Sequence, residues 1–190
     1  MDDHLALREI LDSPKWLPVV KSYEQYSRVD KFEAYFERPW SIHGVMHARR
    51  VLFHTLLLCE LCRMPEPDKE LLISAALFHD IGRDNDGMCF THGKRSMEKM
   101  LALDLAPTDP ESLAVMKFIV VNHCIADSRA VADLQKLPGG VRDRTGRLFE
   151  VLKDADGLDR VRIRDLDLSY LRNPESIRLV GLAHELMDHV

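Results

Sequence analysis

The chain has 190 residues, of which 46% are apolar and 30% charged, an ordinary composition for one folded domain with a sizeable core. Its net charge of −5 and isoelectric point near 6.0 argue against a general nucleic-acid-binding surface. No uninterrupted apolar run is long enough to cross a bilayer, which argues against a membrane protein.

The N-terminus and the cysteines indicate a cytoplasmic protein. The first four residues, Met1 to His4, are acidic and lack the basic and apolar regions of a signal peptide. All four cysteines lie in or beside apolar stretches and are interpreted as reduced thiols: Cys59, Cys62, Cys89 and Cys124. The lone C-x-x-C at Cys59 and Cys62 predicts two small core residues one helical turn apart.

The first sixty residues predict three helices. Apolar residues recur at helical spacing over 3–12. A second helix is expected from Val19 to Glu37, with its aromatic side chains packed in the core, before Pro39 ends it. Ser41 can cap a third helix that runs to about Leu61.

Histidine and arginine side chains share one face of that third helix, at His43, His47, Arg50 and His54. His47 lies among apolar neighbours, whereas His43 is compatible with either a cleft or solvent. We expect four histidines on the surface, namely His4, His54, His184 and His189.

The next segment, Leu71 to Phe78, is apolar nearly all round and belongs inside a domain. It ends on His79 and Asp80, and Gly82 follows as a plausible helix stop. An imidazole beside a carboxylate at the inner end of a buried helix is costly unless both are paired. A bound metal ion is one way to satisfy them.

Histidines also mark two later helix ends. One amphipathic helix starts at His92, and a helix that starts at Pro110 ends at His123. The stretch 126–147 is charged and broken by proline and glycine, so we expect a mobile loop with one short helical piece.

Helices are expected again from about Leu148 and after Asn173. No segment alternates with the period of two that a strand requires. The chain is therefore expected to be all-α, a single-domain helical bundle over residues 1–190.

Four groups are candidates for a shared metal site: His47, His79, Asp80 and Asp156. Each lies on or at the end of an apolar helix, which is how helical folds build an inward-facing site. Imidazole and carboxylate without thiolate suit a divalent ion such as Mn²⁺, Fe²⁺, Co²⁺, Ni²⁺, Zn²⁺ or Mg²⁺. His92 and His123 could complete a second position, with Asp80 bridging the two.

This ordered pattern resembles the H…HD…D signature of the HD-domain superfamily of metal-dependent phosphohydrolases. The matching segments are Gly44-x-x-His47-x-x-Arg50-Val51, His79-Asp80-Ile81-Gly82 and Asp154-Ala155-Asp156-Gly157-Leu158-Asp159, and the resemblance covers about 40–165. It implies an all-helical fold with a metal site between core helices. It also implies hydrolysis of phosphomonoester, phosphodiester or nucleotide substrates at a metal-bound water.

By this resemblance, His47, His79, Asp80 and Asp156 are metal ligands. His92 and His123 are similar to the additional histidines of two-metal members. The position of Arg83 often holds Glu in one-metal nucleotidases and Lys in two-metal phosphodiesterases, so Arg favours the second group. The GYP motif of cyclic-di-GMP phosphodiesterases is absent from the sequence.

Other residues are candidates for contact with substrate. Asp80, Arg83 and Asp84 are the expected catalytic groups, although Asp84 also suits a solvated loop carboxylate. The candidate substrate contacts are His43, Arg50, Lys94 and Lys153, with arginine suited to a bidentate grip on phosphate. Arg162 and Arg164 are expected to be solvated.

We therefore expect a metal-dependent phosphohydrolase that acts on a small phosphorylated substrate, with nucleotides among the candidates. Two alternatives remain open: a di-iron oxygenase that uses His92 and His123 at its second iron, and a non-catalytic binding module. The sequence does not fix the substrate, the metal, the number of ions or the oligomeric state, and a homodimer is compatible with it.

Overall fold

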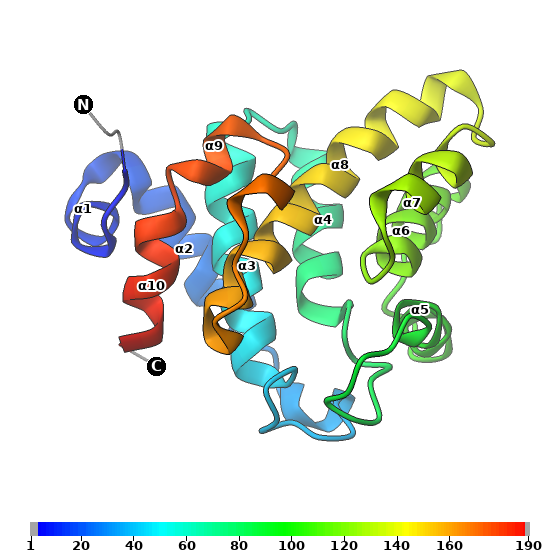
Figure 1. Cartoon of the computed structure of the whole chain (residues 1–190), viewed down its shortest axis with the longest axis horizontal. Helices are drawn as coiled ribbons and strands as arrows, with labels where there is room; N and C mark the ends of the chain where they lie inside the picture. Colours follow the sequence, from blue (N-terminus) through cyan, green and yellow to red (C-terminus); the bar gives the residue numbers. More distant parts are fainter. Residues whose placement is uncertain (1–3, 189–190) are drawn as a thin grey trace.

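A computed structural model describes residues 4–188, and within that range the chain forms helices and no strand (Figure 1). The α-helices are α1 (Leu7–Asp12), α2 (Leu17–Tyr26), α3 (Val45–Leu61), α4 (Glu66–Phe78), α5 (His92–Ala102), α6 (Pro110–Asn122), α7 (Asp127–Leu134), α8 (Gly139–Leu158), α9 (Pro174–Ile177) and α10 (Val180–Asp188). Four 3-10 helices connect them, η1 (Pro14–Trp16), η2 (Phe32–Tyr35), η3 (Asp159–Ile163) and η4 (Leu168–Tyr170). The predicted all-α class is confirmed.

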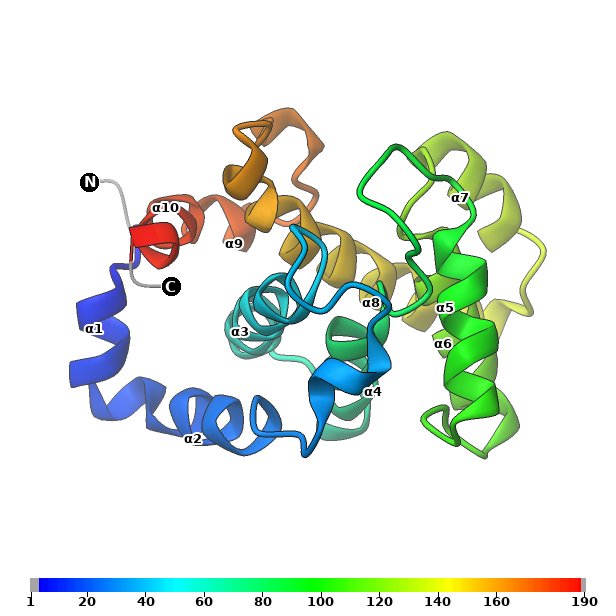
Figure 2. The ribbon, with the colours of Figure 1, turned by 90° about the horizontal axis from the view of Figure 1, so that it is seen from below.

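Helices α3, α4 and α8 pack on one another at the centre, α6 lies against α4 and α8, and α5 packs on α6 and on the segment that follows α4 (Figures 1 and 2). Both α3 and α4 are buried over most of their circumference. This matches their apolar sequences, because a helix that is apolar all round must be covered on every side. At the other end of the molecule, α1 lies beside α10.

The packing of α3 on α4 sets the place of the site. The two helices are joined by the short link 62–65 and run in opposite directions (Figure 1). The first turn of α3, which carries His47, therefore lies at the same end of the molecule as the last turn of α4, which leads into His79.

Three glycines allow the site segments to approach one another. A Cβ atom would lie 2.1 Å from the Pro39 carbonyl oxygen at Gly44, 2.2 Å from the Ser96 nitrogen at Gly82, and 2.4 Å from the Val120 carbonyl oxygen at Gly93. Real Cβ atoms do not come so close to backbone. No described glycine has a positive φ, so Gly82 serves close packing on α5 and not the helix stop expected from the sequence.

Several element boundaries differ from the prediction. The helix expected over 19–37 ends at Tyr26, and the chain turns through Lys31, whose φ of 51° is left-handed, into η2. The third helix starts at Val45 and not at Ser41, whose hydroxyl instead accepts a hydrogen bond from the His43 N–H.

The aromatic residues of this region pack in the core as expected. Tyr23 meets Phe53 edge to face with ring centroids 5.0 Å apart, and Phe32 meets Phe78 at 5.9 Å. No helix among the described residues is long and apolar enough to cross a membrane.

The prediction of a mobile loop over 126–147 is wrong, because α7 and the first half of α8 occupy these residues. Pro138 directly precedes α8, and the glycines after it occupy the first turn of the helix. Tertiary contacts then outweigh weak propensity. Arg144 pairs with Asp68 at 2.6 Å and with Glu111 at 2.8 Å, which ties α8 to α4 and α6.

Candidate metal centre

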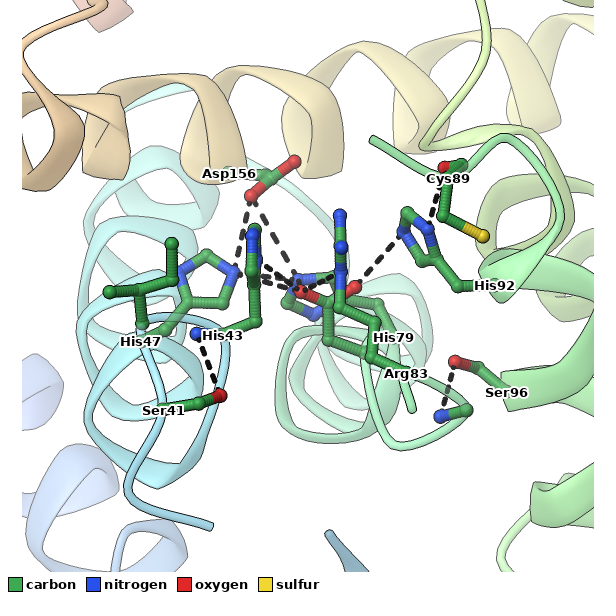
Figure 3. Close-up of polar contacts among 12 residues, drawn as sticks. Ser41, His43, His47, His79, Arg83, Cys89, His92, Ser96 and Asp156 are labelled. Atoms are coloured by element: carbon green, nitrogen blue, oxygen red, sulfur yellow. Dashed lines mark hydrogen bonds and ion pairs between the residues drawn. The ribbon is translucent and has the colours of Figure 1, made fainter. Parts of the chain in front are cut away.

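The first group of site residues comes from the three central helices. The Nε2 atoms of His47 on α3 and His79 after α4 lie 3.1 Å apart. Asp156, in the last turn of α8, places Oδ1 at 3.4 Å from His47 Nε2 and 3.9 Å from His79 Nε2. Figure 3 shows these side chains converging between the helices. We refer to His47, His79 and Asp156 as the first position.

The second group comes from α5 and α6. His92 begins α5 and His123 follows α6, and their Nε2 atoms lie 2.9 Å apart. Both side chains are buried. We refer to His92 and His123 as the second position. Every one of these five side chains lies within one turn of a helix end, where packing of the helices brings the termini together.

Asp80 lies between the two positions and is 3% exposed. Its Oδ2 lies 3.5 Å from His47 Nε2 and 3.8 Å from His79 Nε2. Its Oδ1 lies 3.1 Å from His92 Nε2 and 3.4 Å from His123 Nε2, yet it has no hydrogen bond of acceptable geometry in the described chain. An orphaned buried carboxylate oxygen facing two imidazole nitrogens is typical of a bridging metal ligand.

Hydrogen bonds at the other ring nitrogen fix each tautomer. The Nδ1–H groups of His79, His92 and His123 donate to the carbonyl oxygens of Ala76, Cys89 and Val120, at 2.9, 2.8 and 2.7 Å. A carbonyl oxygen only accepts, so Nδ1 carries the proton and Nε2 of the neutral ring carries a lone pair. The Nδ1–H of His47 donates to Asp159 Oδ2 at 2.7 Å, with the same consequence.

Two lone pairs therefore face each other within each position, at 3.1 and 2.9 Å. This contact is repulsive unless a cation or a proton lies between the nitrogens. Four imidazole nitrogens with one bridging and one terminal carboxylate are the ligand chemistry that first-row divalent ions bind. The residues thus fit a divalent metal at the first position and another at the second.

In the metal-free protein, a proton and not a metal ion lies between the two facing nitrogens of each position. Burial opposes protonation of His47, but hydrogen bonds with Asp156, Asp159 and Asp80 outweigh it and raise the pKa of His47 to about 10. Its neighbour His79 is buried, and its pKa falls to about 3. At the second position burial is again outweighed, chiefly by Asp80, and the pKa of His92 is raised to about 10.

A buried ion-pair network orients His47. Asp159 is completely buried, and its carboxylate accepts from Arg50 Nε at 2.5 Å as well as from His47. Although burial raises the pKa of Asp159, His47 and Arg50 lower it to about 2, so the group is ionised. A carboxylate bonded to the remote nitrogen of a metal-binding imidazole fixes its orientation and strengthens it as a ligand.

Sequence reasoning missed the role of Asp159, although Asp159 lies three residues after Asp156 and therefore on the same helix face. It also predicted that Arg162 is solvated, which is wrong. The Arg162 side chain is 6% exposed, donates to His43 Nδ1 at 3.0 Å, and contacts Asp159 Oδ2 at 3.3 Å.

His43 and Arg83 lie at the mouth of the site. His43 Nδ1 lies 3.0 Å from Arg162 Nη2, from which it can only accept, and 3.2 Å from Asp80 Oδ2, to which it can only donate, so the tautomer of the ring decides which of the two it bonds. Burial lowers the pKa of His43, which keeps the ring neutral. Arg83 places Nε at 3.2 Å from Asp80 Oδ2 but makes no hydrogen bond there, while its Nη1 donates to the Gly87 carbonyl.

A small recess opens beside these groups, with a volume of about 10 Å³, room for about one water molecule. It is lined by Phe36, Arg38, Ser41, His43, Asp80, Arg83, Asn85 and Asp86. Arg38 and Asp86 lie on opposite loops and form an ion pair of 2.7 Å.

The remaining candidates from the sequence are not brought to the cluster by the contacts described. Lys94 is 72% exposed and pairs with Glu98, and the exposed Asp84 pairs with Arg95. Lys153 donates to the Ile125 carbonyl and pairs with Asp127. Arg50 is engaged by Asp159, as described above.

Of the histidines expected on the surface, His4 and His184 are exposed, and His189 lies outside the described residues. His54 is completely buried, so the prediction that it lies on the surface is wrong. Burial lowers the pKa of His54 to about 4. The four cysteines are free thiols.

The comparison with protein families gives one result. The model of the HD domain matches residues 44–161, more than half of the chain, and this segment contains all six candidate ligands. No curated protein and no solved structure matches the chain. HD domains are typical of metal-dependent hydrolases and imply a divalent metal, in agreement with the clustered histidines and aspartates. The chain belongs to the HD-domain family.

Proposed function

We propose that the protein is a metal-dependent phosphohydrolase that cleaves a phosphoester bond of a small phosphorylated substrate. One observation carries the proposal. Two imidazole pairs share the carboxylate of Asp80, and the same carboxylate faces a mouth lined by the cationic side chains of Arg38 and Arg83. A donor set for divalent cations beside arginines suits a substrate with a phosphoryl group.

The metal ions would be held by His47, His79 and Asp156 at the first position and by His92 and His123 at the second, with Asp80 shared. When bound, divalent ions supply activation of water as a nucleophile and offset the charge of a phosphoryl group. The chain contributes the rest. Asp159 holds His47 in the ligating tautomer, and the carbonyl oxygens of the helix ends do the same for the other three rings.

Arg83 and His43 are suited to contact the phosphoryl oxygens. The Nε–H of Arg83 is buried 3.2 Å from Asp80 Oδ2 without a hydrogen bond of acceptable geometry in the described chain, so a phosphoryl oxygen could become its acceptor once the mouth opens. Arg162 and Asp80 both hold His43 at Nδ1, and with its proton on Nε2 the ring could donate to a phosphoryl or leaving-group oxygen. Because the recess holds only about one water, substrate entry requires Arg38 and Asp86 to separate.

The first test is metal content of protein purified without chelators, wild type beside the double variant His92→Ala/His123→Ala. We expect about two ions per chain in the wild type and about one in the variant, since the variant keeps Asp80 together with the three ligands of the first position. Asp80→Ala should bind neither. A wild-type protein without stoichiometric metal would contradict the proposal and favour a non-catalytic module.

The second test separates hydrolysis from oxygen chemistry. We expect the metal-loaded protein to release nitrophenol from p-nitrophenyl phosphate or its bis-ester without O₂, and the ratio of the two rates distinguishes a monoesterase from a diesterase. Turnover that requires O₂ and iron would replace the proposal by the di-iron oxygenase.

A further inference from the structure

The second position contains a thiol that the motif does not include. Cys124 follows His123 at the end of α6. A ring nitrogen of His92, a ring nitrogen of His123 and the sulfur of Cys124 all lie within 4.8 Å of one another. Because Nδ1 of each histidine is engaged by a carbonyl oxygen, the nitrogens available to an ion are the two Nε2 atoms.

The local fold keeps the sulfur in place. Gly93, the second residue of α5, packs against the last turn of α6, where a Cβ would meet the carbonyl oxygens of Val120 and Val121 at 2.4 and 2.8 Å. This close contact brings the start of α5 onto the end of α6, where the Cys124 thiol donates to the Val121 carbonyl oxygen at 3.8 Å. The three candidate ligands are therefore fixed by one helix-to-helix contact.

An independent observation is that the carboxylate oxygen facing the two histidines lacks a hydrogen-bond partner. Asp80 Oδ1 is buried, faces both Nε2 atoms at 3.1 and 3.4 Å, and has no acceptable hydrogen bond in the described chain. The two Nε2 atoms face each other at 2.9 Å without an acceptor between them. Two imidazoles and a sulfur thus lie close together, and a buried carboxylate oxygen faces the Nε2 atoms of the two imidazoles.

The second position also differs from the first in the number of carboxylates that can offset the charge of a metal ion. At the first position, two carboxylates, Asp80 and Asp156, offset the charge of a divalent ion. At the second position Asp80 is the one carboxylate described, and it is shared. A thiol that binds a metal ion loses its proton and adds one negative charge. Cys124 would then give the second position the charge that Asp156 gives the first.

We propose that Cys124 is a ligand of the second position, which is therefore a mixed nitrogen, oxygen and sulfur site. Two imidazoles, one carboxylate and one thiolate form a four-ligand set of the kind that Zn²⁺ and Co²⁺ bind, whereas Mg²⁺ and Mn²⁺ prefer oxygen ligands. The second position is accordingly selective for a thiophilic ion. This inference rests on the metal centre proposed above and adds to it the class of ion and one ligand.

The experiment uses Co²⁺ as the probe in the full-length protein. Wild type loaded with Co²⁺ should show a sulfur-to-cobalt charge-transfer band in the near ultraviolet besides the visible bands of bound cobalt. Cys124→Ser should lose the charge-transfer band and keep the visible bands from the first position. Cys62→Ser is the matched control and should keep both, because Cys62 is a free thiol that follows α3 at the end of that helix opposite to His47.

The outcomes separate the two proposals. Visible cobalt bands without a charge-transfer band, or a band that survives in Cys124→Ser, would overturn the thiolate ligand and leave the metal centre standing. A wild type that retains no cobalt after dialysis would overturn both. If Cys124→Ser retains the fold, its second-position affinity for Zn²⁺ should fall at least about tenfold, with little change for Mn²⁺.

A measurement on the unmodified protein removes dependence on the variant's folding. X-ray absorption at the zinc edge of the zinc-loaded wild type should require a sulfur neighbour at about 2.3 Å, in a ratio of about one sulfur to two zinc ions. A spectrum that fits with nitrogen and oxygen neighbours alone contradicts the proposal.

Discussion

The ligands of the first and second positions of the candidate metal centre are held by different kinds of interaction. The first lies on α3, α4 and α8 in the centre of the molecule, and its His47 is held by the ion pair of Asp159 with Arg50. The second lies where α5 meets α6, and its two histidines are held by backbone carbonyl oxygens. One position is fixed by buried charge and the other by the contact of two helix ends.

Because of this difference, the first and second positions can be altered separately by mutation. Removing a charge from the network around Asp159 disturbs the packed core, because the remaining charges are left buried. Shifting α5 against α6 leaves the contacts of α3, α4 and α8 intact. We therefore expect the second position to be the one that tolerates change, and Asp80 to be the residue whose loss affects both.

The largest effect is expected for Asp80→Ala, which removes a carboxylate that faces all four imidazoles. Metal content should fall from about two ions per chain to near zero, and phosphatase activity should fall to the background rate. Elemental analysis and the nitrophenyl phosphate assay check this. Asp84→Ala, which removes an exposed carboxylate paired with Arg95, is the control, and full activity in Asp80→Ala would contradict the site assignment.

Gly93→Ala should abolish one position only. The added Cβ would meet the Val120 carbonyl oxygen at 2.4 Å and push α5 away from α6, which separates His92 from His123. We expect about one bound ion instead of two, with a cost of about 1–3 kcal/mol in unfolding free energy from overpacking. Gly139→Ala is matched, since nothing lies within 4 Å of its Cβ, and it should keep both ions.

Asp159→Asn should weaken the first position without removing any direct ligand. Loss of the charged partner of His47 is expected to lower metal affinity there by about 10–100-fold, measured by competition with a chelator. The variant should also unfold at lower denaturant concentration than wild type, because Arg50 and Arg162 lose a buried partner. Asp165→Asn, an exposed carboxylate paired with Arg160, should change neither quantity.

The most gradual effect expected is a pH dependence, in which metal affinity rises with pH while the stability of the metal-free protein falls. The pKa values of His47 and His92 are raised to about 10 in the metal-free protein, so metal binding at neutral pH displaces a proton at each position. Affinity should rise by up to about tenfold per pH unit and per proton between pH 7 and 10.

The stability that these two histidines give the metal-free protein is fully present below pH 6.5 and is lost as pH rises through about 10. Thermal unfolding with chelator should therefore show a falling midpoint from pH 7 to 9.5, while the metal-loaded protein does not follow it. A metal affinity that is flat over this range would show that no proton is displaced.

Much of this organisation could be predicted from the sequence because its signals are local. An apolar run followed by histidine, as at His79 and His123, marks a helix end inside a domain, and the structure brings all six candidate ligands together. Their role as ligands stays a prediction. The spacing also contained Asp159, but an acidic residue in a helix is usually solvated, so the pattern gave no reason to select it.

The rest depends on contacts between distant segments. Nothing in the periodicity around Arg162 indicates that it reaches His43, 119 residues away. Pro138, which helped to predict a loop over 126–147, lies just before α8, and the glycines are tolerated within α8, since Arg144 ties that helix to Asp68 and Glu111. The closeness of Cys124 to His92 depends in the same way on the contact at Gly93.

The ion pair of Arg38 with Asp86, which closes the recess beside Asp80, has a consequence for the kinetics of substrate capture. Both side chains are partly exposed, and such a pair contributes no more than about 1 kcal/mol, which dissolved salt screens over about 10 Å at 0.1 M. An arriving phosphoryl group can exchange with Asp86 as the partner of Arg38 at little cost. Salt should therefore loosen the closed mouth while weakening attraction of an anionic substrate, so the association rate should pass through a maximum as ionic strength increases.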